Sequence, residues 1–113
     1  MSDFVSGTIV NACDATFDLT KYYGDWEGER PKDVLAPGET TGFGAKGIIS
    51  ANASAVYKAR GTGVVLDFRI NSGAFESGKA YGVYKASQED VFNVYTRRPR
   101  SFAVEFMIKN WPE

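Results

Sequence analysis

The stretch VLAPGETTGF, residues 34–43, places a tight turn between two short apolar segments. Pro37 fixes φ near the value that the second position of a β-turn requires, and Gly38 readily adopts the positive φ of the third position of a type II turn. Two half-buried strands joined by such a turn are typical of antiparallel β-sandwiches. The stretch therefore predicts short β-strands on both sides of Pro37-Gly38.

Short alternating segments separated by turn residues continue along the whole chain. Residues 64–70 are the clearest example, and the face expected to be buried holds Val64, Leu66, Phe68 and Ile70. Other expected strands are residues 4–10, 16–23, 40–45, 51–59, 79–85, 91–95 and 102–108. We therefore expect an all-β fold, a single-domain antiparallel β-sandwich of about eight short strands over residues 1–113. A helix over residues 45–59, where Ala and Ser weaken the β signal, is the alternative.

The spacing of aromatic, basic and Gly residues gives further local expectations. Strict alternation over residues 16–23 predicts that Tyr23 shares a face with Phe17 and that Tyr22 lies on the opposite face. Residues 97–100, Arg-Arg-Pro-Arg, are interpreted as a charged turn, and Gly42 and Gly44 as a bulge or close backbone approach. The aromatic residues expected in the core are Phe43, Phe68, Phe92, Phe102 and Phe106.

The composition argues against catalysis and against nucleic-acid binding. The 113 residues carry 13 Lys and Arg and 14 Asp and Glu, and the net charge of −1 gives no field to attract a polyanion. The chain has no His, which removes the usual general base near neutral pH and the commonest metal ligand. Cys13 is the only Cys, and its neighbour Asp14 disfavours a reactive thiolate. We expect no enzymatic activity, no catalytic residue, no cofactor and no nucleic-acid partner.

An acidic loop surrounds the first of the two Trp residues. Asp25, Glu27 and Glu29 alternate around Trp26. Carboxylate oxygens are ligands that Ca²⁺ accepts, but the spacing is not that of an EF-hand. We interpret the loop as solvated and assign no metal site, and calcium binding by these three carboxylates stays an open alternative.

Aromatic residues at strand ends and one basic cluster supply the candidate ligand-binding residues. Tyr and Trp combine an apolar ring with a polar group, which suits a membrane interface, a sugar or a quaternary ammonium group. The guanidinium groups of the basic cluster can each hold a phosphate through two hydrogen bonds. The candidates are Tyr22, Tyr23, Trp26, Arg97, Arg98 and Arg100, and the other aromatic residues at strand ends or in loops are Phe75, Tyr81, Tyr84 and Trp111. Rings that merely cover the ends of the sandwich, and a turn kept soluble by its charges, are the alternatives.

Residues 24–43 combine Gly-x-Trp at Gly24–Trp26, a spacer with Pro, the Pro37-Gly38 turn and Phe43. In this pattern, in its acidic balance and in its lack of a secretory signal, the chain resembles the aegerolysin-like and actinoporin-like β-sandwich proteins. Residues 61–68 also look like the Gly-rich turn that enters a central strand in that family. The resemblance implies recognition of sphingolipid-containing membranes, in some members as part of a pore formed with a larger partner protein.

We therefore expect a non-enzymatic module that recognises a membrane-lipid surface, alone or within a lytic or pore-forming system that needs a protein partner or a homo-oligomer. One alternative is a lectin-like sandwich that stacks a sugar on Trp26 or a nearby Tyr, and another is a structural self-assembling protein. The first residues lack the basic and apolar regions of a secretory signal. We expect cytoplasmic synthesis, with non-classical release as the alternative.

Overall fold

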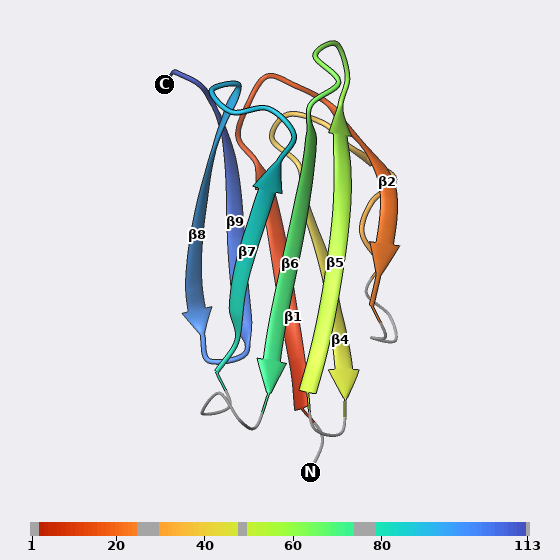
Figure 1. Cartoon of the computed structure of the whole chain (residues 1–113), viewed down its shortest axis with the longest axis vertical. Coiled ribbons are helices and arrows are strands. Elements are labelled where there is room, and N and C mark those ends of the chain that lie inside the picture. The colour runs from red at the N-terminus through yellow and green to blue at the C-terminus, as the bar shows by residue number, and fades with distance from the viewer. Residues whose placement is uncertain (1–2, 25–29, 48–49, 74–78, 113) are drawn as a thin grey trace.

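Nine strands form two sheets that pack face to face in the computed structural model, which describes residues 3–24, 30–47, 50–73 and 79–112 (Figure 1). In chain order they are β1 (Asp3–Asn11), β2 (Phe17–Tyr23), β3 (Val34–Leu35), β4 (Thr40–Gly47), β5 (Ser50–Ala59), β6 (Val65–Gly73), β7 (Tyr81–Ala86), β8 (Phe92–Arg100) and β9 (Ala103–Asn110). The four-stranded sheet has the order β4-β1-β9-β8, and the five-stranded sheet has the order β3-β2-β5-β6-β7. The expected all-β sandwich is confirmed. The alternative helix over residues 45–59 is wrong, because β4 and β5 occupy the described part of that range.

The turn at residues 36–39 has the geometry that Pro37 and Gly38 predict. Gly38 has a φ of 83°, and the Glu39 amide donates a hydrogen bond to the Ala36 carbonyl at 3.0 Å. The strands that it joins belong to different sheets, because β3 pairs with β2 whereas β4 pairs with β1. The turn therefore carries the chain from one sheet to the other instead of closing a hairpin.

The first and last strands lie side by side in the four-stranded sheet. β1 and β9 run parallel, with Ser6 opposite Ala103 and Ile9 opposite Phe106. The other pairings among the described strands are antiparallel, so this pair differs from the antiparallel expectation. As a consequence, residues near the start of the chain and residues entering its last strand meet at the same end of the sandwich.

The core lies between the sheets and is built from inward-facing side chains at alternate positions. Leu66, Phe68 and Ile70 of β6 are fully buried, as the alternation predicts. Phe68 packs on Phe106 of the opposite sheet, with the ring centroids 5.0 Å apart. Full burial of side chains of this size contributes about 1.5–3 kcal/mol each. Other large side chains in the core belong to Val5, Ile9, Phe17, Leu35, Phe43, Tyr57 and Ile108.

Close packing of β7 against β9 depends on a glycine. A Cβ atom added to Gly82 would lie 2.6 Å from Cγ1 of Val104 and 2.8 Å from the Phe106 ring. Both neighbours belong to the packed interior, so a larger residue at this position would force β7 away from the opposite sheet.

A bulge in β2 changes which tyrosine faces the core. The pairing of β2 with β5 shifts register between Leu19 and Lys21, so the strict alternation expected over residues 16–23 is wrong beyond Leu19. Tyr22 packs against the core, whereas Tyr23 lies on the exposed outer face. By contrast, Gly42 and Gly44 pair in regular register with β1, so of the two expected alternatives, a bulge or a close backbone approach, the bulge is absent from that part of β4.

Residues 97–100 lie within β8 and do not form the expected turn. A register shift against β9 falls between Arg97 and Arg100, and the chain turns at Ser101 and Phe102. Phe102 is consequently exposed, which makes its expected place in the core wrong. Phe92 is half-buried at the edge of the core, where its ring packs on Phe17 at 5.3 Å between centroids.

Candidate functional site

The residues expected to bind a ligand together are divided between opposite edges of the sandwich. Tyr22 and Tyr23 belong to β2, which lies beside the edge strand β3, whereas Arg97, Arg98 and Arg100 belong to β8, the edge of the other sheet. Figure 1 shows β2 and β8 on opposite sides of the molecule. Residues 25–29 lie outside the described residues, and with them Trp26 and the three candidate calcium ligands Asp25, Glu27 and Glu29. The structure therefore does not bring the two tyrosines and the three arginines into one site.

Only one of the two tyrosines offers an exposed ring. Tyr22 is half-buried against the core, so its ring has a packing role. Tyr23 is 66% exposed and borders a shallow hollow of about 300 Å³ on the outer face of β2, β5 and β6. The hollow also contains the polar side chains of Lys21, Asn52, Ser54, Arg69 and Asn71.

The three arginines have different surroundings. Arg97 holds the Glu105 carboxylate through two hydrogen bonds, of 2.8 and 3.2 Å, and this partner raises the pKa of the guanidinium. Arg98 donates to the Ala80 carbonyl at 3.3 Å. Arg100 lines a hollow of about 350 Å³ on the outer face of the four-stranded sheet. Of the three, Arg97 is already engaged by a carboxylate and Arg100 borders an open surface.

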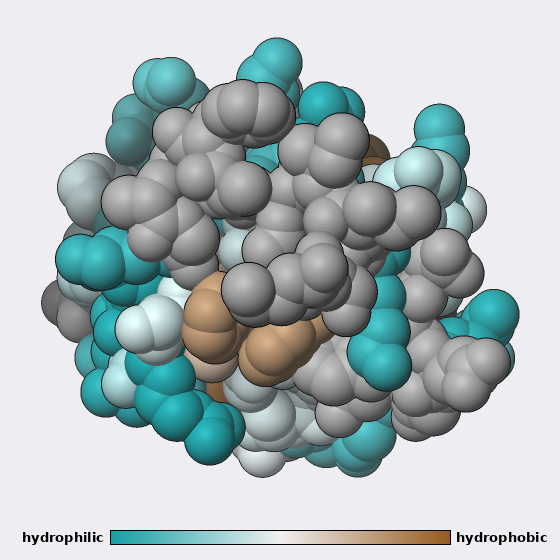
Figure 2. Space-filling model, turned by 90° about the horizontal axis from the view of Figure 1, so that it is seen from below, coloured by the Kyte–Doolittle hydropathy of each residue, from teal (hydrophilic) through white to brown (hydrophobic). Residues whose placement is uncertain are grey.

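The hollow beside Arg100 contains a pair of exposed aromatic rings. The Phe4 and Phe102 rings lie 4.8 Å apart between centroids and are 38% and 37% exposed. The parallel pairing of β1 with β9 brings them together, and the Ser6 amide donates to the Phe102 carbonyl at 2.9 Å. Figure 2 views the molecule from this end and shows a small apolar area with hydrophilic side chains to its lower left.

A second cation borders this pair on the side away from Arg100. Lys46 of β4 is exposed and stands directly opposite Phe4 in the antiparallel pairing with β1, so the two side chains project from the same face. We call Phe4, Phe102, Lys46 and Arg100 the end patch. The sequence pattern identified only Arg100 as a candidate, because Phe4 and Phe102 come together through strand pairing and not through local spacing.

Cys13 has the surroundings of a structural thiol. Its side chain is buried and donates to the amide oxygen of Asn11 at 2.9 Å. Burial raises the pKa of the thiol, and the charge of Asp14 raises it further. Both effects disfavour the thiolate that nucleophilic chemistry requires. The absence of enzymatic activity stays a prediction.

The described acidic residues do not gather into a metal site. Asp18 is held by Arg60 through two hydrogen bonds, of 2.8 and 2.9 Å, and this guanidinium lowers the pKa of the carboxyl. Asp14 accepts from the Asn110 amide at 3.3 Å. Within the described residues, no group of three or more Cys, Asp or Glu side chains could hold a metal ion.

Comparison with known proteins gives no relative: no family model matches the chain, and no curated protein matches it. The resemblance to aegerolysin-like and actinoporin-like proteins therefore stays a prediction. The part of the chain that the structure describes contains no helix with the length and apolarity needed to cross a membrane.

Proposed function

We propose that this protein is a non-enzymatic module that recognises a membrane-lipid surface through the end patch. The observation that carries the proposal is the exposed pair of Phe4 and Phe102, whose rings contact each other at a tilt, with a cation on each side of the pair. Apolar rings at one end of a rigid sandwich can enter the boundary between headgroups and acyl chains, while Lys46 and Arg100 meet the phosphates. Arg98 lies near the same end, held on the Ala80 carbonyl.

The size of the patch predicts weak attachment by a single copy. A Phe ring buries about 150–250 Å² when fully covered, so the exposed parts of these two rings amount to roughly 150 Å². Their transfer out of water contributes roughly 4 kcal/mol, which corresponds to about millimolar affinity. Each cation near an anionic surface adds about 1 kcal/mol. Stable attachment would therefore need several linked copies or a protein partner.

The proposal agrees with what the family resemblance implies and changes the residues involved. Membrane recognition, a lytic or pore-forming system and a protein partner or homo-oligomer are all expectations of that resemblance. Arg100 keeps its expected role in contacting phosphate. Tyr22, Tyr23 and Arg97 are no longer proposed as the main membrane contacts. Phe4, Phe102 and Lys46 replace them, because these three residues form one surface with Arg100.

Vesicle co-sedimentation tests the proposal. The wild-type protein is mixed with vesicles of phosphatidylcholine, of phosphatidylcholine with phosphatidylserine, and of sphingomyelin with cholesterol. We expect binding that is strongest on the anionic vesicles and that weakens as salt is added. The double variant F4S/F102S should lose it, whereas Tyr95→Ser, which removes an exposed ring from the outer face of β8, should bind normally.

Charge reversal separates the cations from the rings. The variant K46E/R100E should lose the preference for anionic vesicles and its salt dependence. Arg60→Glu is the matched control, since it reverses an exposed arginine in the turn at the other end of the sandwich. Wild-type protein that binds none of the three vesicle types, or a folded F4S/F102S variant that binds as well as wild type, would contradict the proposal.

A further inference from the structure

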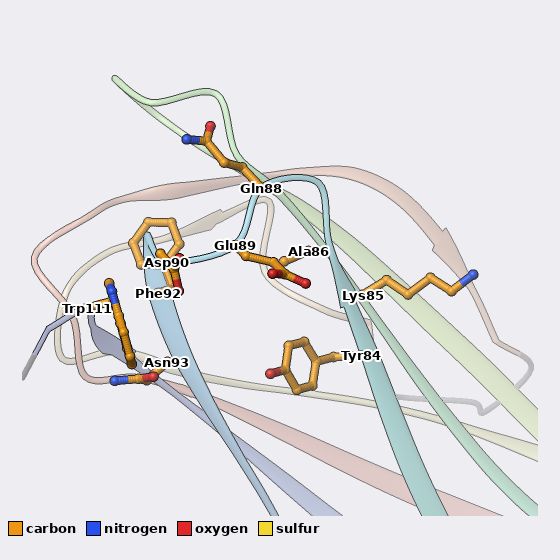
Figure 3. A pocket seen from close by; sticks show the side chains of 9 residues that line it. All are labelled: Tyr84, Lys85, Ala86, Gln88, Glu89, Asp90, Phe92, Asn93 and Trp111. Atoms are coloured by element: carbon orange, nitrogen blue, oxygen red, sulfur yellow. The ribbon is translucent and has the colours of Figure 1, made fainter.

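A larger hollow, of about 620 Å³, lies at the end of the sandwich opposite the end patch. We call it the aromatic groove, and its lining residues are Tyr84, Lys85, Ala86, Gln88, Glu89, Asp90, Phe92, Asn93 and Trp111 (Figure 3). Its volume falls within the range of small-molecule sites. Of the ligand-binding candidates that the structure describes, which are Tyr22, Tyr23, Arg97, Arg98 and Arg100, and of the end-patch residues, none lines it.

The groove exists because two edge strands of different sheets face each other there. β7 ends the five-stranded sheet and β8 ends the four-stranded sheet, and residues 87–91 connect them. Tyr84 pairs with Phe68, so its side chain points inward, yet it is 41% exposed because it stands on an edge. Trp111 is 48% exposed, and its backbone amide donates to the Val91 carbonyl at 3.3 Å. The fold of the sandwich thus fixes the backbone positions of Tyr84 and Trp111 and leaves both rings partly exposed to solvent.

Polar groups surround these rings. Figure 3 shows Tyr84 and Trp111 on opposite sides of the hollow, with the Tyr84 hydroxyl directed into it and Lys85 pointing away. Among the described residues, the structure gives no hydrogen bond or ion pair to the Tyr84 hydroxyl or to the carboxylates of Glu89 and Asp90. These groups are therefore available to a ligand.

Two kinds of ligand suit an aromatic ring beside a carboxylate. An organic cation uses the ring face and the negative charge, whereas a saccharide packs its C–H face on the ring and bonds through its hydroxyls. A cation needs only acceptors, but each saccharide hydroxyl both donates and accepts. The groove offers the Tyr84 hydroxyl and the Trp111 indole N–H as donors next to the acceptors of Glu89 and Asp90. This mixture favours the saccharide.

We propose that the aromatic groove binds a neutral saccharide, with Trp111 as the stacking surface and Tyr84, Glu89 and Asp90 as hydrogen-bonding partners. The site is separate from the end patch, so its occupation does not require a membrane. Neither activity depends on the other, and each can fail alone.

The fluorescence of Trp111 provides the first test. The chain has two Trp residues, so in a Trp26→Phe variant, with excitation selective for tryptophan, the emission comes from Trp111. This variant is titrated with cellotetraose, chitotetraose, laminaritetraose, mannotetraose and xylotetraose. We expect a saturable change in emission with at least one of them, and no comparable change with tetramethylammonium.

Variants with the natural Trp26 then locate the site by calorimetry with the saccharide that binds. Trp111→Ala should weaken binding by at least about tenfold, and Tyr84→Phe, which removes only the hydroxyl, by a few-fold. Tyr95→Ala is the matched control because it deletes an exposed ring outside the groove, and it should bind like wild type.

Three outcomes would overturn the proposal. They are the lack of response to all five saccharides in a folded protein, a response only to tetramethylammonium, and unchanged saccharide affinity in a folded Trp111→Ala variant. Vesicle binding by the same Trp111→Ala variant is measured in parallel. It should be unchanged, which distinguishes the loss of this site from the failure of membrane recognition.

Discussion

The end patch and the aromatic groove place exposed aromatic rings at opposite ends of one sandwich, but in opposite electrostatic surroundings. At the end patch the rings are Phe, without polar atoms, and cations flank them. In the groove the exposed rings are those of Tyr84 and Trp111, which carry polar atoms, and two carboxylates stand beside them. An exposed aromatic ring is therefore not a functional signal by itself. Its neighbours decide whether it suits an anionic lipid surface or a hydroxylated ligand.

The two ends also differ in how the chain builds them. The end patch depends on the parallel pairing of β1 with β9, which fixes Phe4 beside Phe102 within one sheet. The groove depends on the gap between β7 and β8, the edges of two sheets. A change in the position of one sheet relative to the other should therefore alter the groove more than the end patch.

The largest effect should come from Phe106→Ala, which truncates a side chain in the hydrophobic core that supports both ends. Phe106 is fully buried and packs on Phe68, so its truncation should cost about 3–5 kcal/mol of unfolding free energy. Urea denaturation measures this loss, and binding at both ends should fall with the folded fraction. The matched variant Phe102→Ala, at an exposed ring, should cost far less. Equal losses in the two variants would contradict the assignment of Phe102 to the surface.

Gly82→Val should affect the two ends unequally. The new side chain would meet Val104 and Phe106, so we expect a loss of about 1–3 kcal/mol and an outward shift of β7. Because β7 carries Tyr84, saccharide binding should weaken in the protein that stays folded, while vesicle binding should not. Calorimetry and co-sedimentation on the same preparation check this difference. Parallel losses at both ends would argue against independent sites.

One variant at each end should lose only the binding activity of that end. F4S/F102S should weaken vesicle binding by at least about tenfold, which is about 1.4 kcal/mol, and leave saccharide binding within twofold of wild type. Trp111→Ala should do the reverse. Both variants change exposed side chains, so circular dichroism and the thermal midpoint should stay close to those of the wild type. A variant that lost both activities while folded would show that the ends are coupled.

The smallest effect should come from Tyr57→Phe. This change removes one hydrogen bond in the body of the sandwich and leaves the aromatic rings of the end patch and of the aromatic groove in place. The Tyr57 hydroxyl donates to the Lys32 carbonyl at 2.7 Å, so its loss should cost about 1 kcal/mol near neutral pH. Urea unfolding measures this cost, and binding at both ends should be unchanged.

The same tyrosine should shape stability at high pH. Burial raises the pKa of Tyr57 from its ordinary value of 10.0 to about 12. As the pH rises, the unfolded chain therefore loses this proton first, and the stability of the wild type should fall between about pH 10 and about pH 12. Tyr57→Phe should lack this part of the fall. A fall of equal size in both proteins would contradict the raised pKa.

Part of the candidate site could be predicted from the sequence, but not its assembly. Arg100, Tyr84 and Trp111 were recognisable as basic or aromatic residues near strand ends. Alternation over a strand that starts at residue 102 predicts Phe102 in the core. The chain instead turns at Ser101 and Phe102 and starts β9 at Ala103. Side-chain alternation does not predict the boundary of a strand to within one residue. Here a shift of one residue moves the Phe102 ring from the core to a candidate site.

The β2 strand shows the same limit. Alternation over residues 16–23 predicts that Tyr23 shares a face with Phe17, but a register shift after Leu19 turns Tyr22 toward the core and leaves Tyr23 exposed. The shift is defined by the pairing with β5, which comes much later in the chain. No pattern within residues 16–23 encodes it.

Local sequence accounts for the all-β character, the type II turn at Pro37-Gly38 and the buried face of β6. These features depend on backbone preferences and on side-chain alternation, which act within a few neighbouring residues. Three contacts follow from the complete fold and from no local segment: Phe4 lies beside Phe102, Arg97 is engaged by Glu105, and Tyr84 and Trp111 share a groove. These contacts depend on which strands become neighbours and which become edges. That choice is made by the packing of the whole core, and no local segment carries it.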